Sequence, residues 1–221
     1  MINLHSFIGK NVDLKVSGLS EIKGKLIDVG TDVFVLFNGK DYLYIPLAHV
    51  HSLYLNQEEM LTLENQEITP LETEFDTLSF RKVLLNAKGI FSEICVSNKT
   101  IHGYISNIMN DYFVFHSPTY QTLYVSMQHI KYLIPYQTNQ VPYALDKAKF
   151  SALPSTLSLA RSFDAQIKKM VGNIAIFDLY DDVRKIGQIR SIGNHMIELV
   201  TAREEITYVN PKHIKTVHLP N

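Results

Sequence analysis

Short alternating runs of apolar and polar residues, separated by turn residues, fill positions 1–55 of the chain. Between residues 12 and 16, valine and leucine alternate with aspartate and lysine, which is the period-two pattern of a strand with one buried and one solvated face. Further strands are predicted at residues 22–29, 33–37, 42–45 and 52–54. The turn signals Gly30-Thr31-Asp32 and Asn38-Gly39-Lys40 separate strands, and the second is typical of a β-hairpin.

The pattern recurs twice more along the chain, and each copy closes with a related string. The strings are Ile45-Pro-Leu-Ala-His49-Val50-His-Ser-Leu53, Val125-Ser-Met-Gln-His129-Ile130-Lys-Tyr-Leu133 and Val209-Asn-Pro-Lys-His213-Ile214-Lys-Thr-Val217. A repeat of roughly 80 residues is too long for a solenoid unit and suits a small domain. The sequence therefore predicts three tandem domains.

Two glycines keep a constant distance from the histidine of each string, one 40 or 41 residues before it and the other 25 or 26 residues before it. We expect the first to end a short helix in a left-handed cap and the second to let the second strand bend or bulge. The proline at 46 or 211 favours a 3₁₀ turn between the fourth and fifth strands. We predict a structural role for these signature residues, which are Gly9, Gly24, His49, Gly89, Gly103, His129, Gly172, Gly187 and His213.

A short helix is expected at the start of each domain. In the first domain it spans Asn3 to Ile8. The apolar positions that can face one side are Leu78, Val83, Leu84 and Leu85 in the second domain, and Leu159, Phe163, Ile167 and Met170 in the third. We expect these helices to cover one end of a barrel.

The pattern as a whole predicts a mainly β protein of three tandem small Sm/SH3-like five-stranded barrels, each preceded by a short helix. The likeness to these barrels concerns layout and not function. The predicted organisation is a barrel at residues 1–55, an acidic linker at 56–76, a barrel at 77–136, a linker at 137–157 and a barrel at 158–221. Because units of this size have small cores, we expect the barrels to pack together.

Composition and charge restrict the function classes. The net charge is −1, which speaks against a dedicated nucleic-acid binder. The single cysteine, Cys95, lies in an apolar run and predicts a buried thiol in a reducing compartment. The N-terminus lacks the basic start and apolar stretch of a signal peptide, and no run of about 18 apolar residues occurs. We therefore expect synthesis in the cytoplasm and no membrane partner.

The three signature histidines are the first candidates for chemistry. A threefold arrangement could bring His49, His129 and His213 to one metal ion. Nothing in the sequence brings them together, however, and a histidine in a fixed turn more often hydrogen-bonds groups of its own domain. We therefore predict no metal and no other cofactor.

Paired carboxylates in the third domain are the second candidates. Asp181-Asp182 and Glu204-Glu205 offer residue types for acid and base catalysis, but adjacent acids on a strand point apart, and the other two domains lack them. Phosphate-binding loops, zinc-protease strings and nucleophile elbows do not occur in the sequence. We predict no catalytic residues and no enzymatic activity.

RNA binding is the alternative that the sequence leaves open, because Sm-like barrels often bind RNA. The basic residues of the third domain that could contact phosphate are Arg184, Lys185, Arg190 and Arg203, and acids at 178, 181 and 182 flank the first two. Three tyrosines expected to be exposed, Tyr120, Tyr124 and Tyr132, are interpreted as sheet surface rather than as base-stacking platforms. The acidic linker would also repel phosphate, so we expect protein rather than nucleic acid as the partner.

Along nearly all 221 residues the chain resembles the repeat-bearing N-terminal region of Bacillus-type spore coat protein B. The resemblance rests on the helix end His5-Ser-Phe-Ile-Gly9, on the second-strand string from Gly24 to Phe34, and on the closing strings that begin at His49, His129 and His213. It implies a structural component of the spore coat or of its assembly, with no catalytic residue to carry over. The implied partners are other coat or assembly proteins, with a second copy of the chain as a further candidate. The implied location is the spore coat, after synthesis in the mother-cell cytoplasm.

Overall fold

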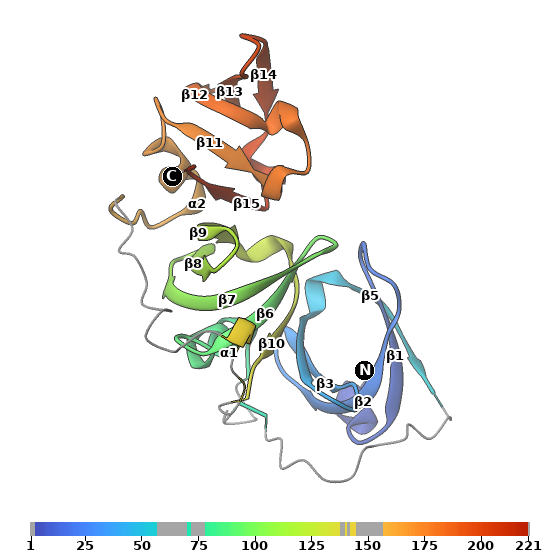
Figure 1. Ribbon diagram of the computed structural model, residues 1–221. Coiled ribbons are helices and arrows are strands. Elements are labelled where there is room, and N and C mark those ends of the chain that lie inside the picture. The colour runs from blue at the N-terminus through green and yellow to red at the C-terminus, as the bar shows by residue number, and fades with distance from the viewer. Residues whose placement is uncertain are drawn as a thin grey trace. The chain divides into compact units, whose positions relative to one another are not determined.

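Antiparallel β-strands are the dominant secondary structure in a computed structural model that describes residues 3–56, 70–71, 78–137, 140, 142–144 and 157–220 (Figure 1). This confirms the mainly β class predicted from the sequence. Two α-helices and several 3₁₀ turns accompany the strands within these residues. No helix in the described part of the chain is long and apolar enough to cross a membrane.

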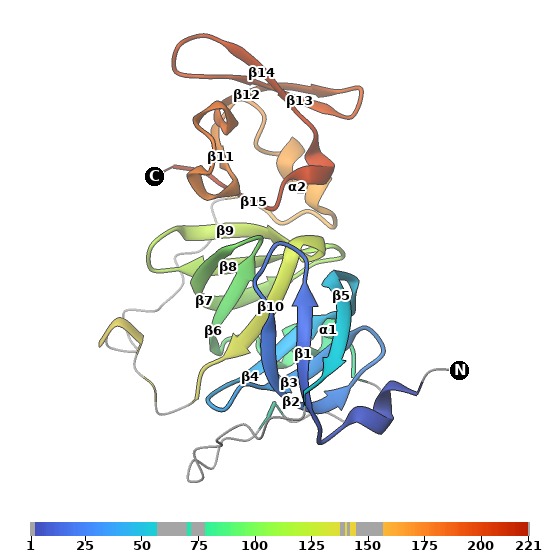
Figure 2. The same ribbon diagram turned by 90° about the vertical axis from the view of Figure 1, so that its right-hand side faces the viewer.

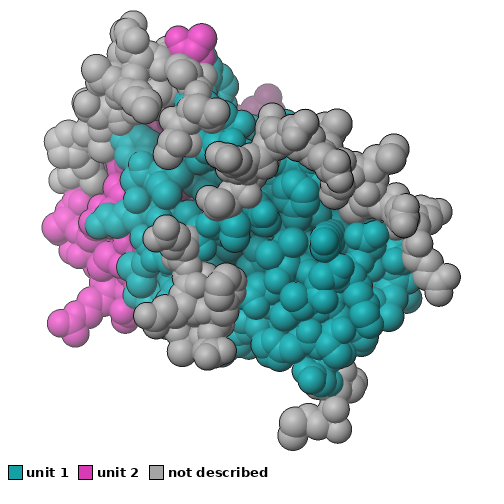
Figure 3. Space-filling model, turned by 90° about the horizontal axis from the view of Figure 1, so that it is seen from below, with its two compact units in different colours: residues 1–104, 130–143 teal, residues 105–129, 144–221 magenta. Residues whose placement is uncertain are grey.

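The chain divides into two compact units (Figure 3). Unit 1 comprises residues 1–104 and 130–143, and unit 2 comprises residues 105–129 and 144–221. The segment 77–136, predicted as one domain, is therefore shared by the two units. Most of the two predicted linkers, 56–76 and 137–157, lies outside the described residues.

Unit 1 contains a complete first set of five strands and part of a second set. The first set is β1 (Asn11–Val16), β2 (Ile22–Val29), β3 (Val33–Phe37), β4 (Tyr42–Pro46) and β5 (Val50–Leu55), with η1 (Leu4–Phe7) before it and η2 (Leu47–His49) between β4 and β5. The unit also holds α1 (Phe80–Asn86), β6 (Phe91–Val96), the first part of β7 (Lys99–Ile108) and β10 (Ile130–Pro135), which η5 (Pro142–Ala144) follows. The strand order is β7-β6-β10-β4-β3-β2-β1-β5.

The first set encloses an apolar core, and its strand bounds agree with the predicted ones to within two residues. The alternate residues of β1 predicted to face inward are buried, and the η1 helix packs against the same core. Strand β2 shifts register between Leu26 and Asp28, close to the predicted bulge. Gly24 is also required by close packing, because an added Cβ would lie 2.6 Å from the carbonyl oxygen of Phe37.

Helix α1 begins where two side chains accept its first backbone N–H groups. Ser79 accepts the N–H of Lys82 at 3.4 Å, and Asp32, in the turn between β2 and β3, accepts the N–H of Phe80 at 2.7 Å. Leu78, Val83 and Leu84 are buried, as predicted, but Leu85 is 51% exposed. Its assignment to the buried face was wrong because consecutive helical residues point about 100° apart.

Unit 2 contains the rest of the second set and a third set. The second-set elements are the end of β7, β8 (Tyr112–Ser117), β9 (Gln121–Ser126) and η4 (Met127–His129). The third set is β11 (Ile174–Phe177), β12 (Ile186–Gly193), β13 (Met196–Val200), β14 (Ile206–Val209) and β15 (Thr216–His218), with α2 (Phe163–Lys168) before it and with η7 (Asp178–Tyr180), η8 (Val183–Lys185) and η9 (Pro211–His213) between strands. The order is β14-β13-β12-β11-β15-β9-β8, and Figure 2 shows β12, β13 and β14 side by side.

Helix α2 begins in the same way as α1. Asp111, in the turn between β7 and β8, accepts the N–H of Phe163 at 2.8 Å. The predicted positions Phe163, Ile167 and Met170 are buried, whereas Leu159 lies before the helix and is partly buried against the same core. An aspartate in the turn after a second strand thus supports the start of the next helix in both units.

The neighbour order within each set is the same: β4-β3-β2-β1-β5, β9-β8-β7-β6-β10 and β14-β13-β12-β11-β15. A 3₁₀ turn separates the fourth and fifth strands of each set, as predicted. Two pairings join one set to the next. In the first joint β10 pairs with β4, in unit 1, and in the second joint β15 pairs with β9, in unit 2.

Candidate functional site

The signature glycines take up the backbone positions that the sequence required. Gly9, Gly89 and Gly172, which follow η1, α1 and α2, have φ values of 84°, 77° and 88°. This is the left-handed region predicted for a helix cap. Gly103 is buried in β7 opposite Ser92. Gly187 lies so close to β13 that an added Cβ would collide with the carbonyl oxygen of Val200.

Two of the signature histidines lie at the joints between strand sets. His49 Nδ1 is 3.0 Å from the Nζ atom of Lys131, in unit 1, and His129 Nε2 is 3.3 Å from the carbonyl oxygen of Lys212, in unit 2. In each contact the histidine reaches a residue of the following strand set. The sequence had instead led us to expect hydrogen bonds within the histidine's own domain. His213 lies in the 3₁₀ turn between β14 and β15 and is exposed.

The signature histidines are divided between the two units. His49 belongs to unit 1, whereas His129 and His213 belong to unit 2. Over the residues that the structure describes, no group of three or more histidine, cysteine, aspartate or glutamate side chains is arranged to hold a metal ion. The contacts of His49 and His129 indicate a role in joining strand sets.

A tyrosine lies five residues before each signature histidine, and two of these three tyrosines lie at the joints. The prediction from the sequence did not include them among the signature residues. The residues are Tyr44, Tyr124 and Tyr208. Tyr44 is 1% exposed and Tyr124 is 3% exposed, so the prediction that Tyr124 lies on the surface was wrong. Burial raises the pKa of the Tyr44 hydroxyl to about 12. The constant distance from the histidine was the signal that could have found this tyrosine.

The third tyrosine, Tyr208, is 61% exposed. It lies on β14, which has β13 as its one neighbour among the described strands. Ile206 on the same strand is 48% exposed. At the other end of the strand order, β5 pairs with β1 alone among the described strands, and Tyr54 and Leu55 are 55% and 50% exposed. Each end of the strand order therefore combines an open backbone edge with exposed apolar side chains.

One of the paired carboxylates of the third set, Asp182, has a local structural role. Asp182 accepts hydrogen bonds from the side chain and backbone of Arg184, and the guanidinium hydrogen bond holds the pKa of this carboxyl below its usual range. Glu204 is in an exposed turn with a φ of 63°. None of the four acids lines the cavity between α2 and the β12–β13 turn.

Three of the four basic residues considered for RNA binding face carboxylates. Arg184 lies 2.9 Å from Asp182, Lys185 lies 2.6 Å from Asp178, and Arg190 lies 3.2 Å from Glu198. Arg203 is exposed. Tyr132, considered as a stacking platform, donates its hydroxyl hydrogen to Glu93 at 2.9 Å. These pairings reduce the positive charge available to a phosphate backbone.

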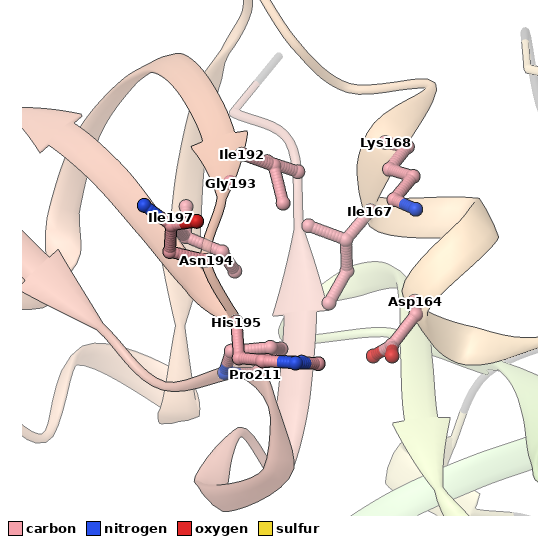
Figure 4. A pocket seen from close by; sticks show the side chains of 9 residues that line it. All are labelled: Asp164, Ile167, Lys168, Ile192, Gly193, Asn194, His195, Ile197 and Pro211. Atoms are coloured by element: carbon pink, nitrogen blue, oxygen red, sulfur yellow. The ribbon is translucent and has the colours of Figure 1, made fainter.

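A cavity of about 370 Å³ opens between α2 and the β12–β13 turn (Figure 4). Ile167, Ile192 and Ile197 form apolar walls. Figure 4 shows the side chains of Asp164, from α2, and His195, from the turn, extending into the same space. The lining contains no serine, threonine or cysteine, so the cavity offers no hydroxyl or thiol nucleophile.

Comparisons with known proteins place the chain in a family. A family model described as the third domain of YwrJ matches residues 162–217, a range that includes α2 and nearly all of the third strand set. Over 227 residues the chain is 40% identical to the uncharacterized protein YwrJ of Bacillus subtilis (strain 168), and the match covers 100% of both chains. The chain belongs to the YwrJ family. Because that YwrJ relative is itself uncharacterized, an inference about function depends on the strand edges and joints described above.

Proposed function

We propose that this YwrJ-family chain is a non-enzymatic structural and interaction protein, built of three small Sm/SH3-like barrels, that acts in the spore coat or in its assembly. The barrel interpretation is supported by the recurring strand order and by the 3₁₀ turn before each fifth strand. The coat role is supported by the resemblance of the repeated strings to those of spore coat protein B.

The observation that carries the interaction role is the pair of open strand edges. Both β5 and β14 have one strand neighbour among the described strands, and both expose large apolar side chains. An unpaired edge offers backbone N–H and C=O groups to another strand, and partner proteins bind such edges by adding a strand. Exposed tyrosine and isoleucine or leucine side chains would add apolar contact at each edge.

The experiment that tests the coat role is fractionation of the organism that encodes the chain. Coat extracts, obtained by decoating spores, and cytosol of growing cells are probed with an antibody against the protein, with one coat marker and one cytosolic marker as controls. We expect the protein in the coat extract. Detection in the cytosol of growing cells, without any in the coat, would contradict the proposal.

Binding to single-stranded RNA is the rival function. Ion pairs hold Arg184, Lys185 and Arg190, three of the four basic residues considered for phosphate contact, so we expect no salt-dependent binding of an oligonucleotide at low ionic strength. Binding whose logarithmic affinity falls steeply with the logarithm of salt concentration would favour the RNA function, because counterion release causes that slope.

A further inference from the structure

The two joints within the chain follow one rule of register. In the first joint Leu133 of β10 lies opposite Tyr44 of β4, and in the second Val217 of β15 lies opposite Tyr124 of β9. The same rule holds in both joints. One residue lies four positions after the signature histidine of its own set, and it faces the tyrosine that lies five positions before the signature histidine of the preceding set. The fourth strand of a set therefore receives the fifth strand of the next set in a fixed alignment.

Both joint tyrosines are buried, and in the second joint the tyrosine shares a core with the neighbouring set. Tyr124 belongs to the same apolar cluster as Phe177 and Val217 of the third set. The residues opposite the tyrosines, Leu133 and Val217, are both fully buried. Where a joint is formed, the tyrosine side chain is thus removed from water together with the opposing residue.

The third set carries the same tyrosine, and among the described strands β14 has no partner on the side where the joints form. Tyr208 occupies the equivalent place on β14 but is 61% exposed, and His213, equivalent to the two joint histidines, is exposed as well. The first set presents the complementary strand, because β5 has an open edge and its Leu53 is the equivalent of Leu133 and Val217. The chain therefore carries one half of a joint on β14 and the other half on β5.

We propose that β14 of one copy pairs with β5 of a second copy as an intermolecular joint of the same kind, so that copies associate head to tail. The register follows from the internal joints: Tyr208 lies opposite Leu53, and Thr207 lies opposite Tyr54. Because the two surfaces differ, each added copy leaves one β14 and one β5 open, and association can continue. This inference rests on the proposed interaction role and names the partner as the chain itself.

The intermolecular joint is weaker than the internal ones, because two of its residues differ. Val35 and Val114, which lie opposite the two joint tyrosines on the adjacent strands, are buried. Glu198 has the equivalent place opposite Tyr208, and it is paired with Arg190. Asp32 and Asp111, which support the next helix, have His195 as their equivalent. Less apolar contact and one missing hydrogen bond make the association reversible and dependent on concentration.

Disulfide cross-linking of the full chain tests the register. Directly opposite residues of antiparallel strands have Cα atoms about 4.5–5.5 Å apart, within the span that a disulfide bridges. The double variant Thr207→Cys and Tyr54→Cys should therefore give a ladder of linked copies on a non-reducing gel. Native Cys95 adds no background, because it is 2% exposed and burial raises its pKa to about 11.

The matched control moves one cysteine along the strand. Thr207→Cys combined with His51→Cys separates the two thiols by roughly 10 Å along β5, so its ladder should be lost. Each single variant should yield no product larger than a dimer. Equal ladders from the two double variants, or no ladder from either, would overturn the proposal.

Light scattering after size-exclusion chromatography, over a concentration series, tests the role of Tyr208. We expect the mass of the wild-type protein to rise with concentration, and the Tyr208→Lys variant to stay monomeric. Val171→Lys, which changes another exposed apolar residue of unit 2 (43% exposed), should behave as wild type. A wild type that stays monomeric, or a Tyr208→Lys variant that still assembles, would refute the joint. Either result leaves the coat location untouched, and coat fractionation decides that separately.

Discussion

The buried carboxylate of Asp178 fixes the start of β15 in unit 2. Its Oδ1 atom accepts the N–H of Lys215 at 2.8 Å and that of Thr216 at 3.4 Å, and its Oδ2 atom is 2.6 Å from Nζ of Lys185. The Asp178 side chain is 1% exposed and that of Lys185 is 29% exposed. Asp178→Asn keeps an oxygen acceptor and tolerates the left-handed φ of 54°, but it removes the charge that Lys185 faces.

Removing one partner of a fully buried ion pair costs about 3–5 kcal/mol of unfolding free energy. Part of this cost is recovered here, because Lys185 can reach solvent and the two N–H groups keep an acceptor. We therefore expect Asp178→Asn to lower the stability of unit 2 by about 2–3 kcal/mol, the range of a hydrogen bond to a charged group. Lys185→Met should cost less, and the double variant should cost at least about 1 kcal/mol less than the sum, because the two residues interact.

Urea unfolding followed by far-ultraviolet circular dichroism measures these changes, and amide hydrogen exchange locates them. Exchange at Thr216 should speed up in the Asp178→Asn variant, while exchange in β1 of unit 1 serves as the internal control. If Asp178→Asn changed stability by less than about 0.5 kcal/mol and the double variant were additive, the reasoning from this ion pair would be refuted.

Three further predictions concern a helix start, a buried histidine and a close-packed glycine. Asp111→Ala should lower stability by about 0.5–2 kcal/mol and Asp111→Asn by less, measured as urea midpoints, because a helix N–H loses its acceptor. Burial lowers the pKa of His218 to about 4, whereas the pKa of a histidine in the unfolded chain is near 6.5. The free energy of unfolding should therefore fall as the pH drops from about 6.5 to 4. His218→Phe should reduce this fall, measured as urea midpoints across that pH range. Gly24→Ala should cost about 1–3 kcal/mol through overpacking, whereas Gly193→Ala, with nothing within 4 Å of an added Cβ, should have little effect on thermal unfolding.

Local pattern was enough to predict the strands of the first set and the 3₁₀ turns. Alternation along β1 and the turn residues around Asn38 act within a few positions, so their structural effect can be read from the sequence. The helices were located less well, because α2 begins at Phe163 and leaves Leu159 outside. A short helix has few periodic positions, and its start depends on a distant acceptor such as Asp111.

The joints could not be predicted, because their partners are far apart in the sequence. Tyr44 and Leu133 are opposite one another across 89 residues, as the numbering shows, and the alternation within each strand is compatible with several edge partners. The three tyrosines have the same sequence context, yet two are buried and Tyr208 is exposed. Exposure at this position is decided by whether another strand follows, which local residue patterns do not encode.

The interleaved composition of the two units has a consequence for synthesis on the ribosome. Residues 105–129 belong to unit 2 but emerge before residues 130–143, which complete unit 1. Tyr112 and Tyr124, which are buried in one core cluster with Phe163 and Phe177 in the finished protein, therefore leave the ribosome before most of unit 2 has been translated. The nascent chain passes through a stage in which these aromatic side chains lack their final surroundings, and such stages are where chaperones act and misassembly begins.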